Sequence, residues 1–198
     1  MNKFVICLFA AVLLVCSVSC RPGEKTGAAA SEFGIYQVIK RDDIPQALID
    51  TLEKLNVIIE ADSLRPFLCY ITVNDTLVLK NDFSEYNLRL VKTYNTVDDA
   101  GKYYALVAIS PSPFINGADV QKTLPDGNNV EIRFNMQGAE KWAEMTSGNI
   151  GNSVAFLVDG EIYAIPVVNA EIRSGVALIN GLENADVASE LSASLNGE

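Results

Sequence analysis

The chain has 198 residues, of which 49% are hydrophobic, and its formal net charge at pH 7 is −10. It contains no histidine, which excludes a Ser-His-Asp or Cys-His catalytic apparatus and any histidine-ligated metal site. The acidic balance opposes binding to nucleic acid or to anionic lipid head groups, and it favours basic or unfolded partners only weakly.

The chain begins with a segment typical of export signals. Lys3 gives a short basic start, and residues 4–15 form an apolar run of about a dozen residues, shorter than the roughly 20 needed to span a membrane. The small residue Ser19 stands directly before Cys20, as in bacterial lipoprotein cleavage boxes. We therefore expect residues 1–19 to be a lipoprotein signal peptide and Cys20 to be the lipidated first residue of the mature chain. Ordinary secretion is the alternative.

Cleavage before Cys20 would change both the charge and the cysteine content of the chain. The net charge would become −11, and Cys7 and Cys16 would leave with the signal peptide. With Cys20 acylated, Cys69 would remain alone, so we expect no intrachain disulfide. Residues 20–32 are rich in glycine, alanine and small polar residues, which predicts a flexible tether before the folded part.

Residues 33–100 predict a small α+β unit of no recognised family. A strand is predicted at residues 34–39, and Asp42 or Asp43 can cap a following helix that carries Pro45 in its first turn. That helix has one apolar stripe, formed by Ile44, Leu48, Leu52 and Leu55. Further strands are predicted at residues 57–59, 67–73, 76–80 and 88–94, with a tight turn at Asn74-Asp75.

Residues 97–102 are polar and mark the predicted boundary, so that residues 101–198 form the second unit. A buried strand is predicted at residues 103–109. After a turn at residues 126–129, apolar and charged side chains alternate over residues 130–134, which indicates a half-buried strand.

The last part of the chain predicts a helix, a hairpin, a strand and a final helix. Asn135 can cap a helix that ends at Gly148. Asp159-Gly160 is the strongest hairpin signal in the chain, and the strand that returns from it contains Pro166. Because proline cannot donate to a strand ladder, this strand must lie at an edge or a bulge. A strand at residues 175–179 follows, and then a helix whose buried stripe is Val187, Ala188, Leu191 and Leu195.

No residue pattern points to catalysis, a cofactor or a metal site. The adjacent acid pairs, Asp42-Asp43 and Asp98-Asp99, stand where a helix start or a loop would place them. The chain has no Walker loop, dinucleotide fingerprint or EF-hand loop. Trp142, the only tryptophan, lies at helical spacing among small apolar residues. This pattern is more typical of a core residue than of a ligand platform, so we predict that Trp142 packs in the core.

Many residues of the second half match a known family in order and spacing. They are Gly138-Ala139, Trp142, Thr146, Asn149-Ile150-Gly151, the run from Val154 to Gly160, Pro166-Val167-Val168, Ile172, Ser174-Gly175, Ile179, Gly181, Ala185, Ala188 and Leu191. This part of the chain resembles the head of the first periplasmic domain of SecD and SecDF, membrane proteins that assist protein export. The resemblance implies a SecD/SecDF head-like fold for residues 101–198, with a short helix at residues 116–122 capped by Asn116. We expect an α+β fold with a mostly antiparallel or mixed sheet and helices packed on one face.

The same resemblance implies a binding role rather than an enzymatic one. The head of SecD and SecDF is thought to contact the emerging, unfolded protein. By that likeness we expect a non-enzymatic, lipid-anchored protein of the bacterial cell envelope, facing the periplasm or the cell exterior, that binds extended or non-native polypeptide in connection with protein export. The alternative is a structural or accessory lipoprotein that holds an envelope complex together through folded partner contacts. Neither hypothesis involves a cofactor or nucleic acid, and the membrane is contacted only through the lipid.

Overall fold

The structure, a computed structural model, describes residues 31–54, 66–72, 87–92 and 103–198. The helices in these ranges are α1 (Gln46–Lys54), α3 (Met136–Gly148), α4 (Ala185–Asn196) and the short 3-10 helices η1 (Arg41–Asp43) and η3 (Gly117–Asp119). The strands are β1 (Phe33–Gln37), β2 (Cys69–Thr72), β3 (Leu88–Lys92), β4 (Tyr103–Ala108), β5 (Ile115–Asn116), β6 (Val120–Asp126), β7 (Asn129–Phe134), β8 (Val154–Val158), β9 (Glu161–Ala164) and β10 (Val176–Ile179). No helix among the described residues is long and apolar enough to cross a membrane.

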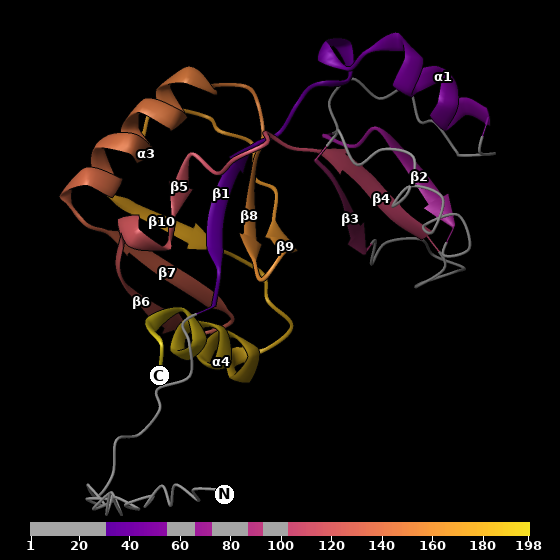
Figure 1. Cartoon of the computed structure of the whole chain (residues 1–198). Helices are drawn as coiled ribbons and strands as arrows, with labels where there is room; N and C mark the ends of the chain where they lie inside the picture. Colours follow the sequence, from indigo (N-terminus) through magenta and orange to yellow (C-terminus); the bar gives the residue numbers. More distant parts are fainter. Residues whose placement is uncertain (1–30, 55–65, 73–86, 93–102) are drawn as a thin grey trace, which may run out of the picture.

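The described strands form three antiparallel sheets (Figure 1). The first has the order β5-β1-β8-β9, the second β10-β7-β6 and the third β2-β4-β3. Helices α3 and α4 accompany the first two sheets, and α1 accompanies the third (Figure 1). The predicted α+β class and the antiparallel pairing are confirmed.

Strands β4 and β8 are buried on both faces and join the sheets into layers. Successive side chains of a strand point to opposite faces of a sheet. In β4, Leu106 packs into the core with α1, whereas Val107 faces the four-stranded sheet. In β8, Leu157 meets the β4 side and Phe156 faces the core with α3 and α4. The layers therefore run from α1 through the sheet of β4 and the sheet of β8 to the largest core.

This largest core, which we call the head core, lies between the sheet of β8, the sheet of β7, and helices α3 and α4. Ile132 of β7, Phe156 of β8, Trp142 of α3 and Leu191 of α4 all belong to it. The alternation predicted for residues 130–134 is confirmed, because the three apolar side chains are buried and the two charged ones are not. At about 25 cal/mol per Å² of buried apolar surface, such a core stabilises the fold mainly by the hydrophobic effect.

The expected division at residue 100 does not separate the sheets. Strand β1, from the first segment, lies between β5 and β8 of the second, with Ile35 opposite both Ile115 and Phe156. Conversely, β4 belongs to the second segment by sequence but is the central strand between β2 and β3. The physical reason for this exchange of strands is that β1 and β4 each have apolar side chains on both faces. Each face must be buried against another layer of the protein.

Two local predictions differ from the structure. Asp42 and Asp43 lie in η1 rather than capping α1, because the chain turns at Ile44 and Pro45 before α1 begins. The helix expected at residues 116–122 is only η3, one turn long, and Val120 already starts strand β6. Asn116 does cap η3 as expected, with its side chain accepting a hydrogen bond from the Ala118 N–H.

Several other predictions fall outside the described residues and stay predictions. They are the signal peptide, nearly all of the tether, Leu55, the strands at residues 57–59 and 76–80, the turn at Asn74-Asp75 and the polar segment at residues 97–102.

Candidate functional site

The described residues hold no cluster of side chains that could form a metal site. No group of three or more histidine, cysteine, aspartate or glutamate residues among them could hold a metal ion. Asp42 and Asp43 are exposed on η1, as a solvated turn requires. Asp98-Asp99 and the expected lipidation residue, Cys20, lie outside the part of the chain that the structure describes.

Trp142 is part of the core, as predicted. It is 3% exposed, and its ring packs between Phe134 and Phe156, with centroid distances of 5.7 and 6.1 Å. The indole Nε1 donates to the Val176 carbonyl oxygen at 3.1 Å. A buried tryptophan normally satisfies its N–H in this way, so Trp142 is not a surface platform.

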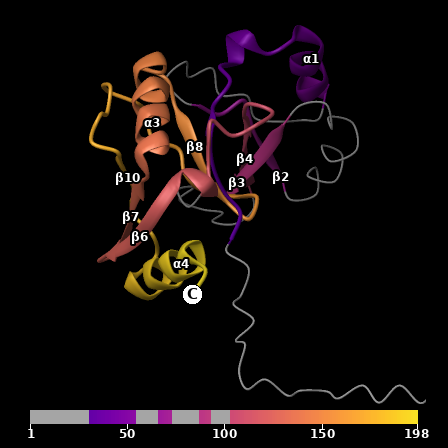
Figure 2. The same ribbon diagram turned by 60° about the vertical axis from the view of Figure 1, so that its left-hand side comes forward.

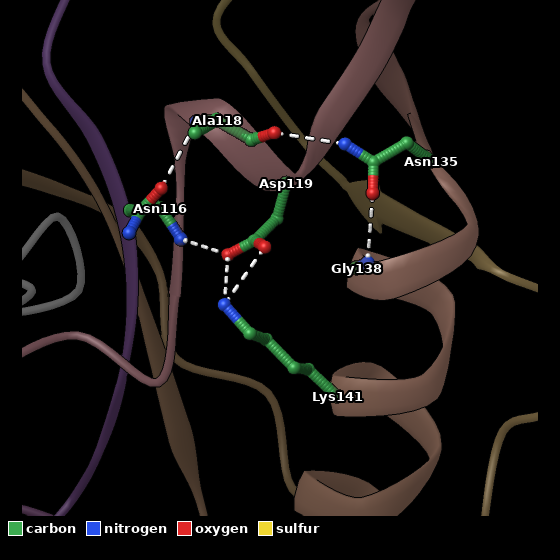
Figure 3. A network of polar contacts seen from close by, with 6 residues as sticks. All are labelled: Asn116, Ala118, Asp119, Asn135, Gly138 and Lys141. Carbon is green, nitrogen blue, oxygen red and sulfur yellow. Dashed lines mark hydrogen bonds and ion pairs between the residues drawn. The ribbon is translucent and has the colours of Figure 1, made fainter.

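A partly buried ion pair connects η3 to α3 (Figure 3). Asp119 is 3% exposed, and its two carboxylate oxygens accept hydrogen bonds from Lys141 Nζ at 2.8 and 3.0 Å. One of these oxygens also accepts from the Asn116 backbone N–H at 3.0 Å. Since the carboxylate is fully engaged in contacts within the fold, we interpret the pair as a structural tie rather than a reactive site.

Asn135 makes a second tie at the same place (Figure 3). Its side-chain oxygen accepts from the Gly138 N–H at 2.9 Å, which caps α3 as predicted, and its Nδ2 donates to the Ala118 carbonyl oxygen at 2.8 Å. Sequence reasoning found the cap but not the link to η3. Nothing local in the sequence could reveal Lys141 and Asp119 as partners, because they are 22 positions apart.

The described surface includes a few exposed apolar side chains, some of them at sheet edges. The large apolar side chains exposed in the described residues are Phe114, Met136, Ile150, Val167 and Leu178. Val167 follows β9, at the edge of the four-stranded sheet, and Leu178 lies in β10, at an edge of the sheet of β7. An exposed sheet edge presents unpaired N–H and C=O groups to other chains. The chemistry available at these edges is therefore recognition of another chain.

Comparison with known proteins identifies the fold to which these features belong. Residues 92–198, just over half of the chain, match the family model described as SecDF, P1 head subdomain. The chain belongs to the SecDF P1 head subdomain family. This confirms the resemblance found in the sequence, and the matched range contains β4 to β10, α3 and α4.

Among the relatives are subunits of the protein translocase. SecDF of Thermus thermophilus is 40% identical over 62 residues, covering 31% of this chain and 8% of that protein. SecD of Rhodothermus marinus is 37% identical over 62 residues, covering 31% and 10%. SecD of a Synechocystis species is 28% identical over 122 residues, covering 55% and 25%. This chain thus spans no more than a quarter of the length of these relatives.

Solved structures of SecDF also align with this chain. One, described as a membrane component that enhances protein export, has a TM-score of 0.48 and 20% identity over 86% of this chain and 64% of that one. SecDF in a super-membrane-facing form has the same TM-score and identity, with 19% of that chain covered.

Proposed function

We propose that this protein is a non-enzymatic lipoprotein of the bacterial cell envelope whose P1 head binds extended or non-native polypeptide in connection with protein export. The match of residues 92–198 to the P1 head subdomain carries this proposal, since the related proteins are translocase subunits. The exposed apolar side chains and the sheet edges support it, because both suit contact with an unfolded chain.

The polypeptide-binding part is tested with one protein in two folding states. The mature chain carrying Cys20→Ala is titrated with labelled lysozyme, either native or reduced and carbamidomethylated, and binding is followed by fluorescence anisotropy. The two forms of lysozyme have nearly the same charge, so attraction to the acidic chain cannot distinguish them. We expect saturable binding of the unfolded form only.

Binding of neither form, together with capture of a single folded partner from envelope extract, would contradict this proposal. That result would support the accessory role, in which the head holds an envelope complex together.

The proposed anchor is Cys20, which would be joined to the folded part through Ser31. The Ser31 N–H donates to the Ser194 carbonyl oxygen of α4 at 3.2 Å, so the tether would leave the fold beside α4. Figures 1 and 2 show α4 and α1 at opposite ends of the molecule. With Cys20 in the membrane, α4 would be the nearer end and α1 the farther one.

Metabolic labelling with a fatty-acid probe tests the anchor. The unchanged protein should take up the label and partition into detergent, and Cys20→Ala should do neither. If the label persists in Cys20→Ala but disappears in Cys16→Ala, the lipid is attached to Cys16 instead.

A further inference from the structure

The outer edge of β6 is already hydrogen-bonded to a side chain of this protein, Asn196. The side-chain amide of Asn196 accepts from the Thr123 N–H at 2.9 Å and donates to the Thr123 carbonyl oxygen at 3.2 Å. It therefore occupies the two positions that a further strand would use. Two residues on, Pro125 lies at the next outward-facing position and has no N–H to offer. Strand addition at β6 is thus blocked.

The edge of β10 is partly closed as well. The Trp142 indole occupies the Val176 carbonyl oxygen, and the Ile172 N–H, in the segment before β10, donates to Thr146 Oγ1 of α3 at 2.8 Å. Helix α3 therefore lies along the start of β10. Only the part around Leu178, whose side chain is 40% exposed, remains outside this cover.

The edge formed by β9 and the residues after it is different. Pairing with the β8 side continues past Ala164, because the Val154 N–H donates to the Pro166 carbonyl oxygen at 3.1 Å and the Val168 N–H donates to the Asn152 carbonyl oxygen at 2.8 Å. Val167 lies between these bonds and bridges Ser153. By the alternation of an antiparallel ladder, its N–H and C=O point away from β8.

Nothing in the described part of the chain pairs with this outward side of Val167, and its side chain is 47% exposed. The missing N–H of Pro166 faces β8, so the outer edge loses no donor there. By the same alternation, Ile165 also presents its backbone groups outward, two residues from Val167. This is the spacing at which an added antiparallel strand forms its hydrogen bonds.

The side chains along this edge carry no charge that would oppose pairing. Proteins commonly protect sheet edges with charged side chains. Residues 162–168 read Ile-Tyr-Ala-Ile-Pro-Val-Val, without a charged residue. At β3, by contrast, the Arg89 guanidinium donates to the Leu88 carbonyl oxygen at 3.0 Å and so occupies an edge group. Free backbone groups with apolar neighbours are complementary to an extended, apolar chain segment.

We infer that the outer edge of residues 162–168 binds an extended apolar segment of unfolded polypeptide by strand addition, with hydrogen bonds to the backbone N–H and C=O of Val167. This inference rests on the proposed function and names its site. Recognition through backbone bonds tolerates many sequences, as a binder of unfolded chains requires, and the partly exposed Ile165 and Val167 side chains supply apolar contact.

The test uses the mature protein with Cys20→Ala and a short, capped peptide of alternating valine and threonine. Val167→Lys places a charge on the edge, and Val167→Pro removes the outward N–H while leaving the bonds to Asn152 and Val154 possible. Each should weaken peptide binding roughly tenfold. Leu178→Lys, a matched charge at the β10 edge, should leave binding unchanged. The same peptide with its central backbone nitrogens methylated should not bind.

Amide hydrogen exchange of the unchanged protein gives a second readout that needs no variant. The peptide should slow exchange of the Val167 N–H, whereas the Val168 N–H, already bonded to Asn152, should change little. Unchanged exchange at Val167, or equal affinity of all variants, would overturn this site while the proposed function survives through binding of unfolded lysozyme. If the unchanged protein binds neither the peptide nor unfolded lysozyme, both the site and the proposed function are overturned.

Discussion

At Gly138, the backbone of α3 packs tightly against that of η3. A Cβ atom there would lie 2.3 Å from the Asp119 carbonyl oxygen. Neither backbone can move away easily, because the Asn135 cap and the Lys141 ion pair hold both sides. We therefore expect Gly138→Ala to lower the free energy of unfolding by about 1–3 kcal/mol, measured by urea denaturation.

Gly148, in the last turn of the same helix, is the matched control. A Cβ atom there would meet nothing within 4 Å. Gly148→Ala should be neutral or should stabilise by up to about 1 kcal/mol, because alanine favours the helix. Equal losses from both substitutions would contradict the close approach at Gly138.

Cys69 should not react with thiol reagents in the folded protein. It is buried in the core shared by α1 and the sheet of β4, and burial raises the pKa of its thiol to about 12, against a smaller opposing effect of Arg41. The thiol is therefore protonated at neutral pH, and only the thiolate reacts. In mature Cys20→Ala protein, a thiol reagent should label Cys69 only as the chain unfolds in urea. Rapid labelling in native buffer would show that this core opens readily.

At the scale of elements, the hairpin between β8 and β9 depends on its two turn residues. Asp159 has φ +50° and Gly160 has φ +81°, as a type I′ turn requires. Gly160→Val should therefore cost about 1–2 kcal/mol of unfolding free energy in urea denaturation. Asp159→Asn should be nearly silent, since an asparagine oxygen can still accept the Glu32 N–H that now donates to Asp159 at 2.7 Å. Equal, small effects from both would indicate a differently built turn.

Elements fixed by local chemistry could be predicted from the sequence, whereas their partners could not. The Asn135 cap, the Asp159-Gly160 turn and the apolar stripe by which α4 contacts the head core are set by neighbouring residues. The alternation of a strand shows that a face is buried but not what buries it. The pairing of β1 with β8 therefore stayed hidden. The candidate edge could not be predicted for the same reason. It exists because β9, which pairs with β8, has no further strand on its other side among the described residues.

At the scale of the whole molecule, the P1 head of this chain contains a strand from outside the matched region. The match begins at residue 92, but β1, at residues 33–37, lies between β5 and β8. Phe33 and Ile35 of β1 belong to the head core. Without β1, strand β8 would keep β9 but lose its neighbour on the other side, and the core would open there. The central claim about this molecule is that its first strand completes the head.

The most direct test compares residues 31–198 with residues 101–198, following Trp142 fluorescence during urea unfolding. We expect the longer chain to unfold cooperatively from a blue-shifted state. The fragment should lack a cooperative transition and emit at longer wavelength, and adding a peptide of residues 31–40, but not its scrambled form, should restore part of the blue shift. A fragment that unfolds cooperatively from an equally blue-shifted state, without the peptide, would contradict the claim.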